Sequence, residues 1–303
     1  MAPETIAAGS LSRCLRASHA APVLRIGAVA WGLTAALLWG CSAIVLARPA
    51  RILGARTTLA WTMAIGAAAV LPLALVVDGV PTAPGDEWAW AIVAGVGFVV
   101  GSGCWLLGVR LGDVSVVTPI VATDGAIAAV IAIATGEVLG AATLVSLGIV
   151  ACGVVLVCLQ PRHANVTTPP AAVFAALGAA VAFGIVFTAS GRTVALGALW
   201  TVAVSRVVGA ALSVPPEAFR RHVPPRWTLP WLAAAALLDA GGFAAIVNGA
   251  GEGVAVASVL ASQYAVVAVV GGVLLYRERL TRRQATGVAL TLIGVAGVAI
   301  ARG

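Results

Sequence analysis

The sequence predicts an all-α polytopic membrane protein in which ten transmembrane helices form two inverted five-helix repeats. Hydrophobic residues make up 61% of the 303 residues and charged residues only 10%, whereas a typical soluble domain carries roughly 25% charged residues. The mean hydropathy is +1.07. Long apolar runs recur along the chain and are separated by short polar connections. These observations exclude a water-soluble globular protein.

Each expected helix is an apolar run of membrane-spanning length. About 20 mainly apolar residues are needed to cross roughly 30 Å of hydrocarbon. The candidate runs, in chain order, cover residues 27–47, 58–77, 88–108, 115–135, 141–159, 171–190, 199–214, 229–248, 254–276 and 284–301. The connections contain glycine, proline, arginine and acidic residues, as in ARPARILGART and VDGVPTAPGDE, which favour turns outside the hydrocarbon.

The chain divides into two halves of similar length. A shift of 141 residues places Glu137 on Glu278, Gly112 on Gly253 and other glycines on glycines. Each half contains five runs, and because five is odd, the second half enters the membrane from the opposite side, as in many secondary transporters. We therefore expect a flexible tail over residues 1–26, a first repeat over 27–160, a linker over 161–170 and a second repeat over 171–303.

Three segments carry a family resemblance. They are ALLWGCSAIV in the first run, IATGEVLG after the fourth, and VASVLASQYAVVAVVGGVLLYRERLTRRQATGVALTLIGVAGVAIA near the end of the chain. They resemble the drug/metabolite transporter superfamily, specifically its ten-helix EamA-type members, over residues 29–301. The last segment is the most specific, and Asp124 stands about where that family commonly has proline. The resemblance implies a transporter of small metabolites with a central cavity, and it leaves the substrate open.

Three ionisable residues, Asp124, Arg206 and Asp239, lie near the middle of apolar runs. A charge there costs on the order of 3 kcal/mol and usually faces a bundle interior or a cavity. In one interpretation Arg206 binds a substrate carboxylate or phosphate, and an aspartate binds a proton or a substrate amine. In the other, Arg206 only pairs with an aspartate and stabilises the bundle. Since one cation cannot neutralise two separate acids, we expect at least one of the three to contact substrate or a coupling ion.

Polar and aromatic side chains accompany these charges. Gln263 and Tyr264 interrupt the ninth run within a turn of the position that matches Asp124 in the repeat, and Trp39 and Trp61 offer flat apolar walls. Small-molecule sites combine such walls with a few polar anchors. We expect these four residues to line the pocket, with ordinary packing as the alternative for the two tryptophans.

Two glutamates match each other in the repeat but are interpreted as structural. Glu137 and Glu278 each lie just ahead of a helix start, where a negative charge is favourable. Thr281 followed by Gln284 has the pattern of a capping box.

Missing residue types exclude several functions. The 18 basic residues are all arginine, so a retinal or pyridoxal aldimine and a Walker-type ATPase lack their lysine. His19, His163 and His222 lie outside the apolar runs, which argues against haem or zinc in the bundle. The arginines lie mostly in short connections, a pattern that fits lipid headgroups rather than nucleic acid. We expect no enzyme activity, no cofactor and no bound metal.

The sequence favours secondary transport of a small polar or amphiphilic metabolite, in the direction of export and with protons as the coupling ion. A lipid-linked-sugar flippase of the same superfamily and a non-transporting membrane scaffold stay open as alternatives. We expect a multi-pass protein of the bacterial inner (plasma) membrane. The orientation and the oligomeric state stay open, because the family keeps both termini in the cytoplasm whereas the arginine count places them outside.

Overall fold

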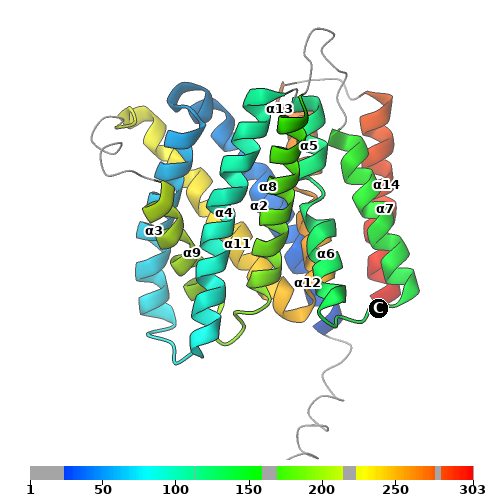
Figure 1. The fold of residues 1–303 in the computed structure, drawn as a ribbon, viewed down its shortest axis with the longest axis horizontal. Helices are drawn as coiled ribbons and strands as arrows, with labels where there is room; N and C mark the ends of the chain where they lie inside the picture. Colours follow the sequence, from blue (N-terminus) through cyan, green and yellow to red (C-terminus); the bar gives the residue numbers. More distant parts are fainter. Residues whose placement is uncertain (1–23, 113, 159–168, 214–222, 277–280, 303) are drawn as a thin grey trace, which may run out of the picture.

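The computed structural model describes residues 24–112, 114–158, 169–213, 223–276 and 281–302. Within these ranges every element is a helix, and Figure 1 shows the helices packed side by side with the chain's C-terminal end at the lower edge. Most of the expected N-terminal tail, residues 161–168 of the expected linker, and Glu278 lie outside the described residues.

In the described part of the first half, the chain forms six helices. They are α2 (Leu24–Leu53), α3 (Ala55–Val77), α4 (Gly85–Leu111), α5 (Val114–Val121), α6 (Asp124–Ala134) and α7 (Ala141–Cys158). The second half forms α8 (Pro170–Ser190), α9 (Ala198–Ser213), the short 3-10 helix η1 (Arg226–Thr228), α11 (Leu229–Glu252), α12 (Val254–Ala261), α13 (Tyr264–Tyr276) and α14 (Arg282–Arg302).

Seven helical segments of the described chain are long and apolar enough to cross a membrane by length and composition. Three further apolar helices, at Ala141–Val157, Ala198–Ser213 and Val254–Ala268, are shorter. The described part of this membrane protein is therefore all-helical, with seven full-length candidate spans where the sequence predicts ten spans.

The fourth and ninth apolar runs are not single helices. In the fourth run, Thr123 N donates to Ile120 O at 3.2 Å, and the Thr123 hydroxyl donates to the same carbonyl at 2.7 Å. In the ninth run, Gln263 N donates to Leu260 O at 3.1 Å. Such i to i−3 bonds tighten the chain, and local side-chain bonds compete with the regular helical pattern. The fourth run is thereby divided into α5 and α6, and the ninth into α12 and α13.

Helices of the first half pack mainly against helices of the second. The most extensive contacts join α2 to α11, α7 to α14, α4 to α8 and α3 to α9, and α6 packs against α12. Close approach depends on small residues, because apolar burial gives helices no net attraction within lipid. At the α7–α14 contact, a Cβ added to Gly287 would lie 2.7 Å from Gly153 O. The halves are thus interleaved rather than separate.

Candidate functional site

A cavity of about 410 Å³ lies among helices from both halves of the chain. Its wall comes from α2, α3, α4, α5, α8 and α11 and from the first residues of α6 and α13. It extends from Asp124 and Tyr264, at the two helix breaks, to Ala50 and Ala55, where α2 meets α3. The cavity therefore joins the middle of the bundle to one end.

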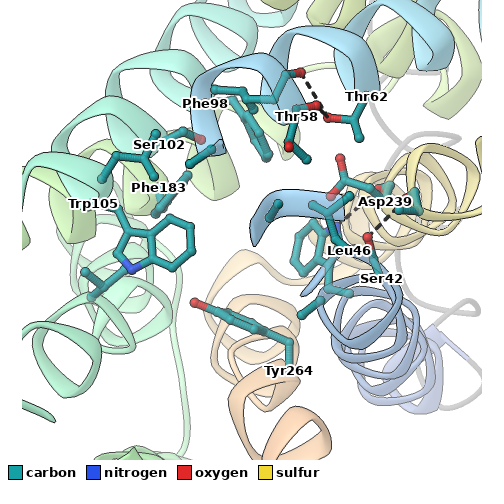
Figure 2. A pocket seen from close by; sticks show the side chains of 18 of the residues that line it. Ser42, Leu46, Thr58, Thr62, Phe98, Ser102, Trp105, Phe183, Asp239 and Tyr264 are labelled. Carbon is teal, nitrogen blue, oxygen red and sulfur yellow. Dashed lines mark hydrogen bonds between the residues drawn. The ribbon is translucent and has the colours of Figure 1, made fainter. Parts of the chain in front are cut away.

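Aromatic rings form much of the cavity wall. Trp39 stacks on Phe187 with ring centroids 5.7 Å apart and planes at 20°, and it meets Tyr264 edge-on at 6.4 Å. Figure 2 shows the Tyr264 ring reaching into the cavity toward Trp105 of α4. A Cβ on Gly242 would lie 2.7 Å from Trp39 Cδ1, so this glycine lets the indole lie against α11.

The buried cation beside the cavity is paired. Arg206 Nη1 lies 2.6 Å from Asp239 Oδ2, and Nη2 donates to Asp239 O at 3.3 Å. The guanidinium carbon also lies 5.2 Å from the Phe98 ring centroid and 5.7 Å from that of Phe243. Arg206 is only 2% exposed, while Asp239 is 18% exposed and lines the cavity. The Arg206 guanidinium therefore does not line the cavity, and it forms an ion pair with Asp239, which does.

Asp124 has a different environment. It is the first residue of α6, lines the cavity and is 2% exposed. Its Oδ1 accepts hydrogen bonds from Gly125 N at 2.7 Å and from the Ser262 hydroxyl at 2.7 Å. Within the described ranges both hydrogen bonds to this carboxyl fall on Oδ1, and the ion pair at the cavity belongs to Asp239. Asp124 thus links the break in the fourth run to the break in the ninth.

Two segments of the chain match one family model, the EamA-like transporter family, at residues 26–159 and 170–300. The chain belongs to this family. The match confirms the resemblance seen in the sequence, and this EamA-like transporter is an integral, multi-pass membrane protein.

A solved structure titled "Crystal structure of protein" is similar to this EamA-like chain with a TM-score of 0.72 and 22% sequence identity. The similarity covers 91% of this chain and 98% of that one, and it shows a shared fold. Among curated proteins no significant match is found.

The structure of this EamA-like transporter brings four of the seven predicted site residues to the cavity wall. These are Trp39, Asp124, Asp239 and Tyr264. The other three predicted residues, Trp61, Arg206 and Gln263, are not among the residues that line it.

Those three residues are placed as follows. Arg206 makes the ion pair that the second interpretation of the sequence predicts. Gln263 is 3% exposed, and its Nε2 donates to Val259 O one turn back along the chain at 3.1 Å. Trp61 is half-buried on α3.

Sequence reasoning missed Ser262 and most of the aromatic wall. A signal for Ser262 existed in the repeat. The helices α6 and α13 begin at Asp124 and Tyr264, 140 residues apart, so a local register of 140 matches Ser262 and Gln263 to Ala122 and Thr123. A uniform shift of 141 residues does not align these two pairs of residues.

Glu137 stabilises a helix other than the one that it precedes. Its Oε2 accepts a hydrogen bond from Ala255 N, in the first turn of α12, at 3.1 Å. A carboxylate is favourable at the positive end of that helix. The predicted capping box is confirmed, since Thr281 N donates to Gln284 Oε1 at 3.0 Å and Gln284 N donates to the Thr281 hydroxyl at 3.3 Å.

Proposed function

We propose that this protein is a secondary transporter that exports a small polar or amphiphilic metabolite through the cavity and exchanges it for protons at Asp124. The observation that carries the proposal is that the buried carboxyl group of Asp124 lies on the cavity wall and forms no ion pair with Arg206. Arg206 is bound to Asp239, while Asp124 is held by a hydroxyl and a backbone amide. Ionisable residues at this depth commonly belong to ion or proton pathways.

The proposed architecture is ten spans in two inverted repeats within a bacterial inner membrane. The reciprocal packing of the two halves supports it. The first span of each half contacts the third span of the other half, α2 with α11 and α8 with α4, and α3 and α7 contact their counterparts α9 and α14. The short helices α5 and α12 are both eight residues long and both precede a break. Binding at the interface of such repeats, near discontinuous helices, is the usual arrangement of secondary transporters.

Alternating access requires that the cavity be closed at one end while it is open at the other. The cavity extends to Ala50 and Ala55 at one end of the bundle. Toward the other end the helices approach closely: a Cβ on Gly32 of α2 would lie 2.8 Å from Ala257 O of α12. In the proposed cycle these contacts between halves open as those near Ala50 close, so that Asp124 faces each compartment in turn.

Proteoliposome flux tests the proposal. The purified protein is reconstituted with a trapped pH dye, a pH gradient is imposed, and proton movement is recorded on addition of a mixture of small cellular metabolites. We expect metabolite-dependent proton flux with the native chain and at least tenfold less with Asp124→Asn. Asp78→Asn, at an exposed position next to α3, is the matched control and retains native flux.

The result separates the alternatives. Native-sized, pH-dependent flux in Asp124→Asn would exclude this residue as the proton carrier. A scaffold gives no flux with any metabolite. A lipid-linked-sugar flippase moves labelled glycolipid between leaflets and leaves the trapped dye unchanged.

A further inference from the structure

We infer that the ligand of this cavity is an amphiphilic organic cation that places its positive charge at Asp124 and its apolar part against the aromatic wall. The inference rests on the proposed function, because it names the class of substrate for the same cavity. Three independent features of the described residues lead to it: the charge balance, the direction of the hydroxyl hydrogen bonds and the aromatic rings.

The charge balance of the site is negative. Two carboxyl groups, Asp124 and Asp239, line the cavity, and one guanidinium, that of Arg206, lies behind it. Arg206 is bound by Asp239 at 2.6 Å and lies against the rings of Phe98 and Phe243. An anionic ligand would have to displace Asp239 from this contact. A cationic ligand can instead bind to Asp124, whose charge the Arg206–Asp239 ion pair does not neutralise.

Three of the five serine and threonine hydroxyl groups on the wall also favour a cation. Ser42 donates its proton to Ala235 O at 3.0 Å, Thr58 donates to Gly54 O at 2.9 Å, and Thr62 donates to Thr58 O at 3.0 Å. Each hydroxyl has one proton and two lone pairs. With the protons used by backbone carbonyls, these groups present acceptor lone pairs to the cavity. An ammonium group can use acceptors, whereas a carboxylate or phosphate requires donors.

The rings supply the remaining contact. Trp39 contacts both Phe187 and Tyr264, and Trp105 faces Tyr264 across the cavity. The negative faces of aromatic rings attract organic cations. The rest of the wall is mainly aliphatic, and the volume of about 410 Å³ falls within the range of roughly 300–1,000 Å³ that is usual for small-molecule sites. The ligand therefore carries apolar groups in addition to its charge.

A proton and the cation compete for Asp124. Its own helix α6 packs against α7, α8 and α12, and these three helices contain no Asp, Glu, Arg, Lys or His in their described sequences. The other titratable or charged groups of the site are the Tyr264 phenol, at the start of α13, and the Asp239–Arg206 pair. Protonation of Asp124 removes the charge that the cation needs, so binding strengthens as the pH rises.

Equilibrium binding to the purified, full-length protein in detergent tests this inference with three probes. Tetraphenylphosphonium and benzyltrimethylammonium are cations, and tetraphenylborate carries the same four phenyl groups as the former with the opposite charge. We expect at least one cation to bind at least tenfold more tightly than tetraphenylborate. In the pH range where Asp124 is mainly protonated, the apparent Kd of that cation should fall about tenfold for each unit by which the pH rises.

Variants assign the effect to Asp124. Asp124→Asn is expected to lose at least tenfold in affinity for the cation and to lose the pH dependence, while Asp124→Glu retains both. Asp78→Asn binds as the native protein does. Should Asp124→Asn fail to fold, as judged by size-exclusion chromatography, a pH-independent affinity in native protein and in Asp124→Glu still overturns the inference.

Two outcomes overturn the cation proposal outright: tetraphenylborate binding as tightly as both cations, or unchanged pH-dependent cation binding by Asp124→Asn. If neither cation binds while metabolite-dependent proton flux still requires Asp124, only the substrate class is wrong. If a cation binds as expected but proteoliposomes carry no flux, the cation site stands and the transport proposal fails.

Discussion

Arg206 and Asp239 form a buried ion pair whose two members differ in their surroundings. Arg206 is 2% exposed and has contacts with Phe98, Phe243 and the Met63 sulfur, whereas Asp239 is 18% exposed at the cavity. Breaking a buried pair by removing one partner leaves an uncompensated charge, while replacing both partners by apolar groups is often neutral. The pair is therefore expected to stabilise the bundle only as a unit.

A double-mutant cycle tests this expectation. Asp239→Leu should lower the free energy of unfolding by about 3–5 kcal/mol, because it leaves the Arg206 charge buried. Arg206→Met should lower it by less, because Asp239 is 18% exposed at the cavity. The double variant should lie closer to the native protein than either single variant. Denaturant-induced unfolding in detergent measures all four proteins, and additive losses in the double variant would show that the pair has no coupling energy.

Buried charges were visible in the sequence, but their pairing was not. Asp124, Arg206 and Asp239 stand out because each interrupts an apolar run. Which aspartate meets Arg206 depends on how α9 and α11 are rotated about their axes, and hydropathy contains no such information. The same rotation places Trp39 on the cavity wall while Trp61 is not among its lining residues.

At the level of elements, the two broken runs are held together by Asp124 and Ser262. Gly125 follows Asp124 and lets α6 approach α12: a Cβ there would lie 2.5 Å from Ser258 O and would also contact the Ser262 hydroxyl. This hydroxyl donates to Asp124 Oδ1. The absence of a side chain at Gly125 is therefore a condition for the hydrogen bond between the two breaks.

Gly125→Ala is expected to separate α6 from α12. Overpacking of this kind costs about 1–3 kcal/mol, and here it also weakens the Asp124–Ser262 hydrogen bond. Gly103→Ala, in α4 with nothing within 4 Å of the added Cβ, is the control and should be neutral or stabilising by up to about 1 kcal/mol. Thermal unfolding of both variants in detergent makes the comparison. Equal midpoints would mean that the helices accommodate the methyl group.

Most helices of the described chain could be predicted from apolar length, with boundaries that agree within several residues. The breaks at residues 122–123 and 262–263 could not, because a few polar residues leave the average hydropathy of each whole run high. Thr123, Ser262 and Gln263 are polar residues in otherwise apolar runs, and local hydrogen bonds of Thr123 and Gln263 accompany the breaks. A run of membrane-spanning length predicts that a segment enters the bilayer, and it leaves the continuity of the helix undetermined.

For the molecule as a whole, the cavity and the connection between α6 and α7 lie at opposite ends of the bundle. Ala50 lines the cavity at the end where α2 meets α3. Val138 lies in the α6–α7 connection and is 93% exposed. The two positions therefore report on the two faces of the membrane, and they address the orientation on which the arginine count and the family expectation disagree.

Cysteine labelling at these positions determines both the architecture and the orientation. In a chain whose five native cysteines are replaced, Ala50→Cys and Val138→Cys are exposed in separate cells to a membrane-impermeant maleimide. With both termini in the cytoplasm, Ala50→Cys reacts in intact cells, and Val138→Cys reacts only after permeabilisation. The reverse pattern places the termini outside, as the arginine distribution predicts, and keeps the same fold. Reaction of both cysteines from one face contradicts the arrangement itself, because the three spans between them, α3, α4 and the broken run α5–α6, should place them on opposite faces.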